Sequence, residues 1–330
     1  MNNIFKGETM VQKRMFVLLI CLAMISVPAL AQEQGGRGGR GGRGGEAPAA
    51  GAARGAAAPD PVKKPMQIKP NLWDIADGGA NSVVEVTPEG LILGDTKNPG
   101  AEIEAAMIAE IKSISPLPVK YVFNTHPHAD HFSHNQVFID QGAKVVGTKH
   151  LKELWEAGNL KDTPGKPNLL FDKDYVLKFG GTEVEAHYFG SAHTDADTIV
   201  FFKKQKFVML SDLVNFANPS PGVSGTNAVQ VPGILDKVLK LDFDTAIAGR
   251  GPVLKKADVQ AYQKTWDTFM KRVNDAVKVG ATKETLAMQV KMDDLFSPGL
   301  KAPWAFNANF FGLLFDALKS NPKGEPRQAD

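Results

Sequence analysis

Thr125-His126-Pro127-His128-Ala129-Asp130-His131 contains three of the seven histidines of this chain, together with a carboxylate. The run directly before it, residues 119–124, is apolar and rich in β-forming residues, which is typical of a strand. We therefore expect the cluster on the loop at the carboxyl end of a strand, where α/β folds place their chemistry. Imidazole and carboxylate groups at this spacing predict a metal site. Zinc suits these ligands, and iron or manganese also accept them.

Two further positions downstream complete the predicted site. His193 lies in the segment Gly190 to Asp195, between two β-type runs, and is the natural third imidazole. With His126 and His128 it would form a three-histidine zinc site whose fourth position is open. Asp212 also follows a β-type run directly. Its carboxylate could bridge to a second metal, for which Asp130 and His131 are the remaining candidate ligands.

The first 31 residues have the pattern of a cleavable signal peptide. Lys13 and Arg14 precede an apolar run, and Ala29-Leu30-Ala31 supplies the small residues of a cleavage site. We expect a periplasmic or secreted protein, cleaved near Ala31, with no stable membrane insertion afterwards. An uncleaved anchor is the alternative. The only cysteine, Cys21, lies in this leader, so the mature chain has no thiol ligand and no disulfide.

Residues 32–65 form a low-complexity linker of Gly-Gly-Arg repeats and an Ala/Pro-rich stretch, which is expected to be disordered. Arginine–glycine repeats can also bind RNA. Without the basic leader and linker, however, the remaining chain is slightly acidic. We therefore expect no nucleic-acid partner and interpret this segment as a spacer.

Residues 66–320 are long enough for one large domain, and residues 321–330 are expected to be a flexible tail. Stretches rich in strands and stretches rich in helices occur twice in the same order, which suggests two αβ halves packed sheet to sheet with helices outside. Strands are predicted over 71–75, 80–86, 91–93, 119–124, 143–147, 175–179, 183–189, 198–203, 207–210 and 245–248. Helices are predicted over 101–114, 136–141, 151–157, 232–239 and 257–279.

The ordered set His126-x-His128-x-Asp130-His131, His193 and Asp212 resembles the metallo-β-lactamase superfamily over residues 70 to 280. The resemblance implies an α/β fold, the four-layer αββα sandwich, with one or two zinc ions in a shallow groove and a hydrolytic metal-bound hydroxide. Members of the superfamily hydrolyse β-lactams, lactones, thioesters and phosphoesters. The resemblance alone therefore does not name a substrate.

Arg250 departs from the pattern of this family, which usually has a further histidine ligand in the corresponding turn. Here the turn is Ala248-Gly249-Arg250-Gly251-Pro252. A guanidinium cannot bind a metal, and a unit charge about 5 Å from a divalent ion costs on the order of 6 to 7 kcal/mol at an effective dielectric constant near 20. We expect Arg250 to pair with Asp212 or Asp130, leaving one secure zinc and a doubtful second site. The alternative is that Arg250 turns toward solvent and water fills the vacant position.

The predicted function is an exported zinc hydrolase acting on an amide, ester, lactone or thioester in a small-molecule substrate. Asp130 would orient the nucleophile and take its proton, and Arg250 would anchor the substrate or stabilise an oxyanion. The alternative is a non-catalytic or mononuclear metal- or ligand-binding relative whose second metal site is impaired by Arg250.

The remaining histidines, and the aspartates near His193, are not predicted to bind the metal directly. His134, His150 and His187 are interpreted as surface or supporting residues. Asp195 and Asp197 are interpreted either as partners that orient an imidazole or as solvated turn residues. The segment 215–231 is a candidate rim of the groove, and the aromatic residues from Phe306 to Phe315 suit the buried face of a helix.

Overall fold

The structure is a computed structural model that describes residues 60–157, 160–214, 223, 226–292, 294–295 and 306–323. Contacts within the chain separate residues 1–54 from 55–330, and every described residue belongs to the second unit. The predictions for the leader, for most of the linker, for the rim segment 215–222 and for the last seven residues therefore fall outside the described residues. Within the described part, no helix combines the length and the apolar character needed to cross a membrane.

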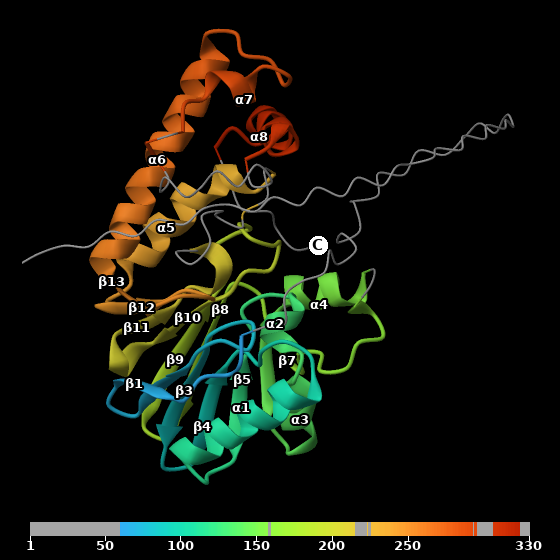
Figure 1. Cartoon of the computed structure of the whole chain (residues 1–330), viewed down its shortest axis with the longest axis vertical. Helices are drawn as coiled ribbons and strands as arrows, with labels where there is room; N and C mark the ends of the chain where they lie inside the picture. The colour runs from blue at the N-terminus through green and yellow to red at the C-terminus, as the bar shows by residue number, and fades with distance from the viewer. Residues whose placement is uncertain are drawn as a thin grey trace, which may run out of the picture. The chain divides into compact units, whose positions relative to one another are not determined.

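The first half of the domain builds a seven-stranded sheet in sequential order (Figure 1). Its first four strands pair antiparallel and its last four pair parallel, because helices return the chain to the same edge after β4, β5 and β6. The strands are β1 (Met66–Lys69), β2 (Leu72–Ile75), β3 (Ser82–Thr87), β4 (Gly90–Gly94), β5 (Val119–Phe123), β6 (Lys144–Thr148) and β7 (Leu169–Phe171).

The second half builds a six-stranded sheet in the order β13-β12-β11-β10-β9-β8. All neighbouring pairs are antiparallel except β11 and β12, which run parallel and therefore end at the same edge. The strands are β8 (Asp174–Phe179), β9 (Thr182–His187), β10 (Ile199–Phe202), β11 (Phe207–Met209), β12 (Thr245–Ile247) and β13 (Val253–Lys255).

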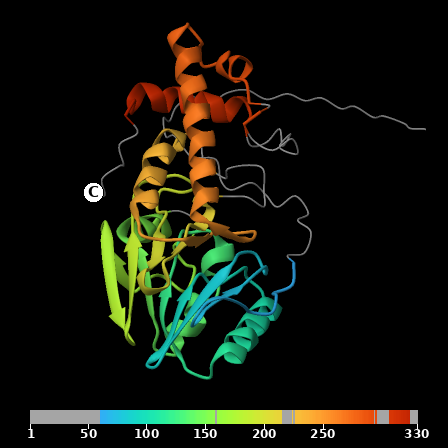
Figure 2. The same cartoon turned by 90° about the vertical axis from the view of Figure 1, so that its left-hand side faces the viewer.

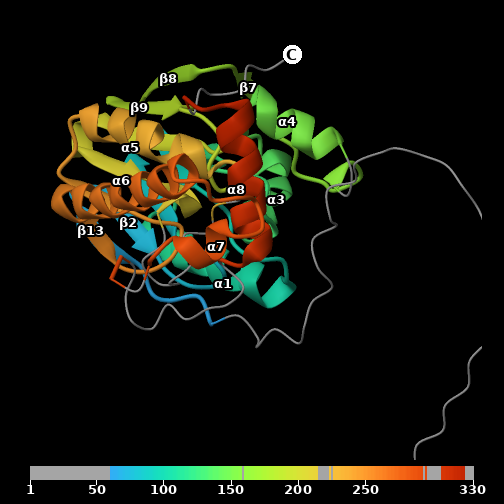
Figure 3. The same ribbon diagram turned by 90° about the horizontal axis from the view of Figure 1, so that it is seen from above.

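Helices cover the outer face of each sheet. The helices of the first half are α1 (Ala101–Ile114), α2 (Ala129–Phe132), α3 (Asn135–Asp140) and α4 (Lys149–Glu156). Those of the second half are α5 (Val231–Lys240), α6 (Lys256–Lys278), α7 (Leu286–Gln289) and α8 (Ala308–Ser320). Helices α5 and α6 lie side by side in Figure 3, and the far end of α6, with α7 and α8, stands clear of the sheets in Figures 1 and 2.

Alternation of apolar residues along the strands explains the four layers. Val83 and Ile92 face the second sheet, where they join a core with Val200 and Met209. Their neighbours along the first sheet, such as Val84 and Leu93, face outward and pack with Met107 and Ile111 of α1. On the second sheet, Ile199 and Phe201 likewise turn outward to a core that includes Trp266 and Phe269 of α6. Because successive side chains of a strand point to opposite faces, both sheets are buried on both sides.

This architecture confirms the predicted αββα sandwich. Every predicted strand and helix is present, with its ends shifted by a few residues, and α1 has the predicted bounds. The aromatic run from Phe306 to Phe315 falls largely on α8, where Phe310, Phe311 and Phe315 are buried. Strands β1, β7 and β13 were not predicted. Each has three or four residues and lies at a sheet edge, so none carries a full alternating pattern.

Candidate metal centre

The candidate metal centre lies where strands of both sheets end. His126 follows β5, and His128 precedes the short helix α2, which carries Asp130 and His131. His193 lies on the loop between β9 and β10, and Asp212 lies on a single 3-10 turn after β11. Arg250 is on the turn after β12, so the parallel pairing of β11 with β12 brings it to the same edge as Asp212. The structure thus brings together all the predicted site residues.

Three imidazoles face a common point. Nδ1 of His128 lies 3.0 Å from Nε2 of His126 and 2.8 Å from Nε2 of His193. Burial and the neighbouring imidazoles lower the pKa of His126 well below 6.5 and that of His128 to about 3. Uncharged imidazoles keep a lone pair for a metal, and three of them match the ligand set of catalytic zinc. The residues present therefore fit one metal at this position.

Ser211 holds the ring of His126 from behind. Its Oγ lies 2.8 Å from Nδ1 of His126, and both residues are fully buried. Metal binding through Nε2 requires the ring proton on Nδ1, where the hydroxyl oxygen of Ser211 can accept it. Ser211 has a φ of 53°, a left-handed conformation that is uncommon for a residue with a β-carbon. The strained backbone therefore places a hydroxyl where His126 needs an acceptor.

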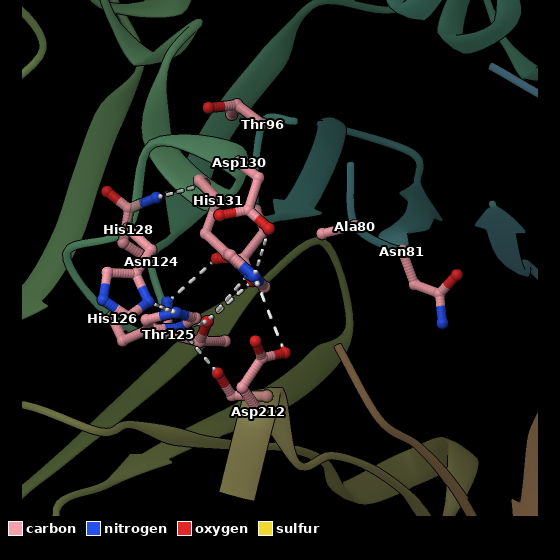
Figure 4. A network of polar contacts seen from close by, with 12 residues as sticks. Ala80, Asn81, Thr96, Asn124, Thr125, His126, His128, Asp130, His131 and Asp212 are labelled. Carbon is pink, nitrogen blue, oxygen red and sulfur yellow. Dashed lines mark hydrogen bonds and ion pairs between the residues drawn. The ribbon is translucent and has the colours of Figure 1, made fainter. Parts of the chain in front are cut away.

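His131 lies beside His126, between the carboxylates of Asp130 and Asp212 (Figure 4). Its Nδ1 donates to Oδ2 of Asp95 at 2.7 Å, and its buried Nε2 has no hydrogen-bond partner. This Nε2 lies 3.4 Å from Oδ2 of Asp130 and 3.7 Å from Oδ1 of Asp212. Burial opposes charging of the ring, but Asp95 and Asp212 outweigh it and raise the pKa of His131. His126, His131 and Asp212 form a second group of close ligand atoms.

Arg250 pairs with the carboxylate of Asp212, which belongs to this second group, and with that of Asp130 beside it. Its Nη1 donates to Oδ2 of Asp212 at 2.5 Å, and its Nη2 donates to Oδ2 of Asp130. The side chain of Arg250 is 37% exposed, whereas those of Asp130 and Asp212 are 14% and 6% exposed. Of the two arrangements expected for Arg250, the structure confirms the pairing and not the turn toward solvent.

Asp197 orders the loop that carries His193. Its carboxylate accepts hydrogen bonds from the backbone N–H groups of Ala192 at 3.0 Å, His193 at 2.7 Å and Thr194 at 3.0 Å. Asp197 thus positions the backbone beside the imidazole. Asp195, by contrast, accepts from Nδ2 of Asn227 at 3.1 Å.

The remaining histidines lie outside both groups of ligand atoms. His134 is buried and contacts Asn98 and Glu104, and His150 is buried against Tyr188. Neither is a surface residue, which corrects that part of the expectation for them. His187 is the last residue of β9 and pairs with Asp174.

Sequence reasoning missed four residues that support the site: Asn81, Asp95, Lys97 and Ser211. Asp95 follows the apolar strand β4 directly, and that signal, also used for Asp212, could have identified it. Lys97 is fully buried and donates to the carbonyl groups of Ile75, Asp77 and Ala80 at 2.6, 2.8 and 2.7 Å. Nothing in the sequence marks a lysine in a turn as buried, since lysine is usually exposed.

Fold and site together define an αββα protein with a histidine-rich metal centre at the edge of its two sheets. The chain belongs to the metallo-β-lactamase superfamily, whose family model matches residues 75–274. It is 28% identical over 170 residues to metallo-β-lactamase IND-1 of Chryseobacterium indologenes, covering 51% of this chain and 68% of that protein. It is 21% identical over 229 residues to the 2,4-dinitroanisole O-demethylase subunit alpha of Nocardioides sp. (strain JS1661), covering 67% of each.

Solved structures show the same fold. The metallo-β-lactamase from Pontibacter korlensis superposes with a TM-score of 0.54 at 18% identity, covering 62% of this chain and 99% of that one. The inverting sec-alkylsulfatase Pisa1 from Pseudomonas sp. superposes with a TM-score of 0.61 at 16% identity, covering 78% of this chain and 50% of that one. The fold is therefore shared by proteins of different named activity.

Proposed function

We propose that this protein is an exported zinc-dependent hydrolase with one zinc on His126, His128 and His193. The observation that carries the proposal is the convergence of three imidazole nitrogens. Nδ1 of His128 lies 3.0 Å from Nε2 of His126 and 2.8 Å from Nε2 of His193. Zinc at such a site lowers the pKa of water to about 7 and polarises a substrate carbonyl. A small-molecule amide, ester, lactone or thioester is the proposed substrate.

The residues around the imidazoles have distinct proposed roles. Asp130 shares one carboxylate oxygen with Arg250, which leaves the other to orient a water molecule and accept its proton. Arg250 is the more exposed of the pair, so its guanidinium can also meet a substrate carboxylate or a developing oxyanion. Ser211 and Asp197 hold His126 and the His193 loop in place.

A panel of candidate substrates tests this function. Zinc-loaded protein is assayed with β-lactams, lactones and thioesters, and also with an aryl methyl ether and a secondary alkyl sulfate, because relatives are named for such substrates. His126→Ala should abolish any true activity. His187→Ala is the matched control, since its imidazole lies outside the ligand groups and contacts Asp174 and Glu185. Turnover that survives His126→Ala, or none with any substrate, contradicts the proposal.

The second candidate is a non-catalytic relative that binds a metal or a ligand. The pairing of Arg250 with Asp130 favours it, because the proposed proton acceptor is then partly neutralised. Tight zinc binding that depends on His126, without turnover of any substrate in the panel, would support this candidate.

Export is proposed from the leader pattern and the low-complexity sequence after it. Expression with the native leader, followed by cell fractionation, tests it. We expect the protein in the periplasm or medium with an N-terminus near Gln32. Retention of the full-length chain in the cytoplasm would contradict export.

A further inference from the structure

A cation, Arg250, already lies against the second group of ligand atoms. The two guanidinium nitrogens of Arg250 reach two carboxylates from different loops, Asp212 after β11 and Asp130 on α2. A second metal held by His131 at this position would draw on the same two carboxylates. Arg250 and a divalent ion therefore compete for one set of acceptors.

Other protein ligands for a second metal are nevertheless in place. His131 directs its buried, unpartnered Nε2 toward the oxygens of Asp130 and Asp212, at 3.4 and 3.7 Å. Its other nitrogen is fixed by Asp95, so the ring cannot turn away without losing that bond. Arg250 replaces the further histidine that the family usually has in this turn, and its charge opposes a second metal at the ligands that remain.

Asn81 keeps Arg250 in this place. Its backbone N–H donates to the carbonyl of Gly249 at 2.7 Å. Its Nδ2 donates to the carbonyls of Ala248 at 3.0 Å and Gly251 at 3.1 Å. The N–H of Gly249 donates in turn to Ser211 at 2.7 Å. A β-carbon at position 249 would collide with Oδ1 of Asp212, so only glycine permits this approach of the turn to the carboxylate.

We infer that Arg250 occupies the position of a second metal as a permanent cation, and that the protein binds a single divalent metal. The inference rests on the proposed function only in sharing its metal centre. The guanidinium supplies the positive charge that the two carboxylates need, without the exchange that a metal ion undergoes. One metal on His126, His128 and His193 is then the complete complement.

Zinc titration of the metal-free protein tests the inference. Each variant is stripped with a chelator, titrated with zinc in a calorimeter, and then dialysed and analysed for bound metal. We expect one zinc per chain in the wild-type protein and in Arg250→Lys, which keeps the cation. Arg250→His and Arg250→Ala should gain a second zinc, and binding should be tighter in the histidine variant, roughly 100-fold or more above any second binding in the wild type.

Two results would overturn the inference. One is a second tightly bound zinc in the wild-type protein, a measurement that depends on no variant. The other is a stoichiometry of one in both Arg250→His and Arg250→Ala when circular dichroism shows that they are folded.

These results are independent of turnover. One zinc without hydrolysis removes the proposed function and leaves the inference standing. Two zinc ions with hydrolysis would overturn the inference and leave the hydrolytic activity standing without its single-zinc assignment.

Discussion

The ring N–H of His131 donates to the carboxylate of Asp95 across 2.7 Å, and both residues are completely buried. The same carboxylate accepts from the backbone N–H of Thr125 at 2.9 Å and from its hydroxyl at 2.7 Å. Asp95 therefore joins the end of β4 to the loop that begins the metal centre. It fixes that loop on one side and the orientation of His131 on the other.

Asp95→Asn should lower the free energy of unfolding by about 1–3 kcal/mol, because an amide cannot accept all the hydrogen bonds that this carboxylate receives. Urea denaturation in the presence of a chelator measures the change. Asp174→Asn is the control, because its carboxylate also pairs with a histidine, at 2.6 Å from His187, but is 64% exposed. That variant should stay within about 0.5 kcal/mol of the wild type. Equal losses in the two variants would contradict the role given to Asp95.

Ser211→Gly should separate metal binding from stability. Glycine accepts the φ of 53° without strain, so the metal-free protein should keep its unfolding free energy within about 1 kcal/mol. Zinc affinity should fall roughly 10–100-fold, because His126 loses the hydroxyl that holds its ring. Competition with a chromogenic chelator measures the affinity. Unchanged affinity would show that the hydroxyl of Ser211 has no part in positioning His126.

Asp197→Asn should weaken zinc binding by about 10-fold, because an amide cannot accept all the N–H groups that order the His193 loop. Asp195→Asn is the matched control two residues away. Its side-chain oxygen can still accept from Asn227, so its zinc affinity should equal that of the wild type. The opposite ranking of these two variants in the chelator competition would assign the positioning role to Asp195 instead.

Glu85→Gln should change how stability depends on pH. Burial raises the pKa of this carboxyl above 4.5, and its Oε2 has no hydrogen-bond partner. A raised pKa in the folded state favours folding at low pH, and this contribution is lost as the pH rises through the folded-state pKa. The glutamine variant lacks that loss, so it should melt at a higher temperature than the wild type near about pH 8.

Thermal melts of Glu85→Gln and wild type from about pH 4.5 to about pH 8 provide the comparison. The difference in melting temperature should shrink toward the acidic end. A difference that stays constant across the range would contradict the titration of Glu85. Glu85 lies in β3 and accepts a hydrogen bond from Thr182 of β9. It is not among the candidate metal ligands, so metal content should not alter the result.

The sequence was sufficient for those features that repeat or follow a strand. The stripe of apolar residues in α1 predicted its bounds, and the histidines were expected on a loop because an apolar strand precedes them. The pairing of Arg250 with Asp212 or Asp130 was one of two arrangements expected from the family resemblance, in which this turn usually carries a metal ligand.

Features that depend on distant backbone were not accessible from the sequence. Ser211 has an ordinary side chain whose role comes from its left-handed backbone. Asn81 acts through carbonyls about 170 residues away, and no local pattern encodes such a contact. Lys97 is buried, unlike most lysines, because three backbone carbonyls converge on its ammonium group.

The three histidine ligands of the predicted zinc site come from both sheets. His126 and His128 extend from the seven-stranded sheet, whereas His193 lies between strands of the six-stranded sheet. A metal on these three residues would therefore link the two sheets, and neither half of the domain carries all three ligands. Metal binding would then depend on correct packing of the two sheets against each other. A chain cut between β7 and β8 should therefore reassemble more readily with zinc than without it.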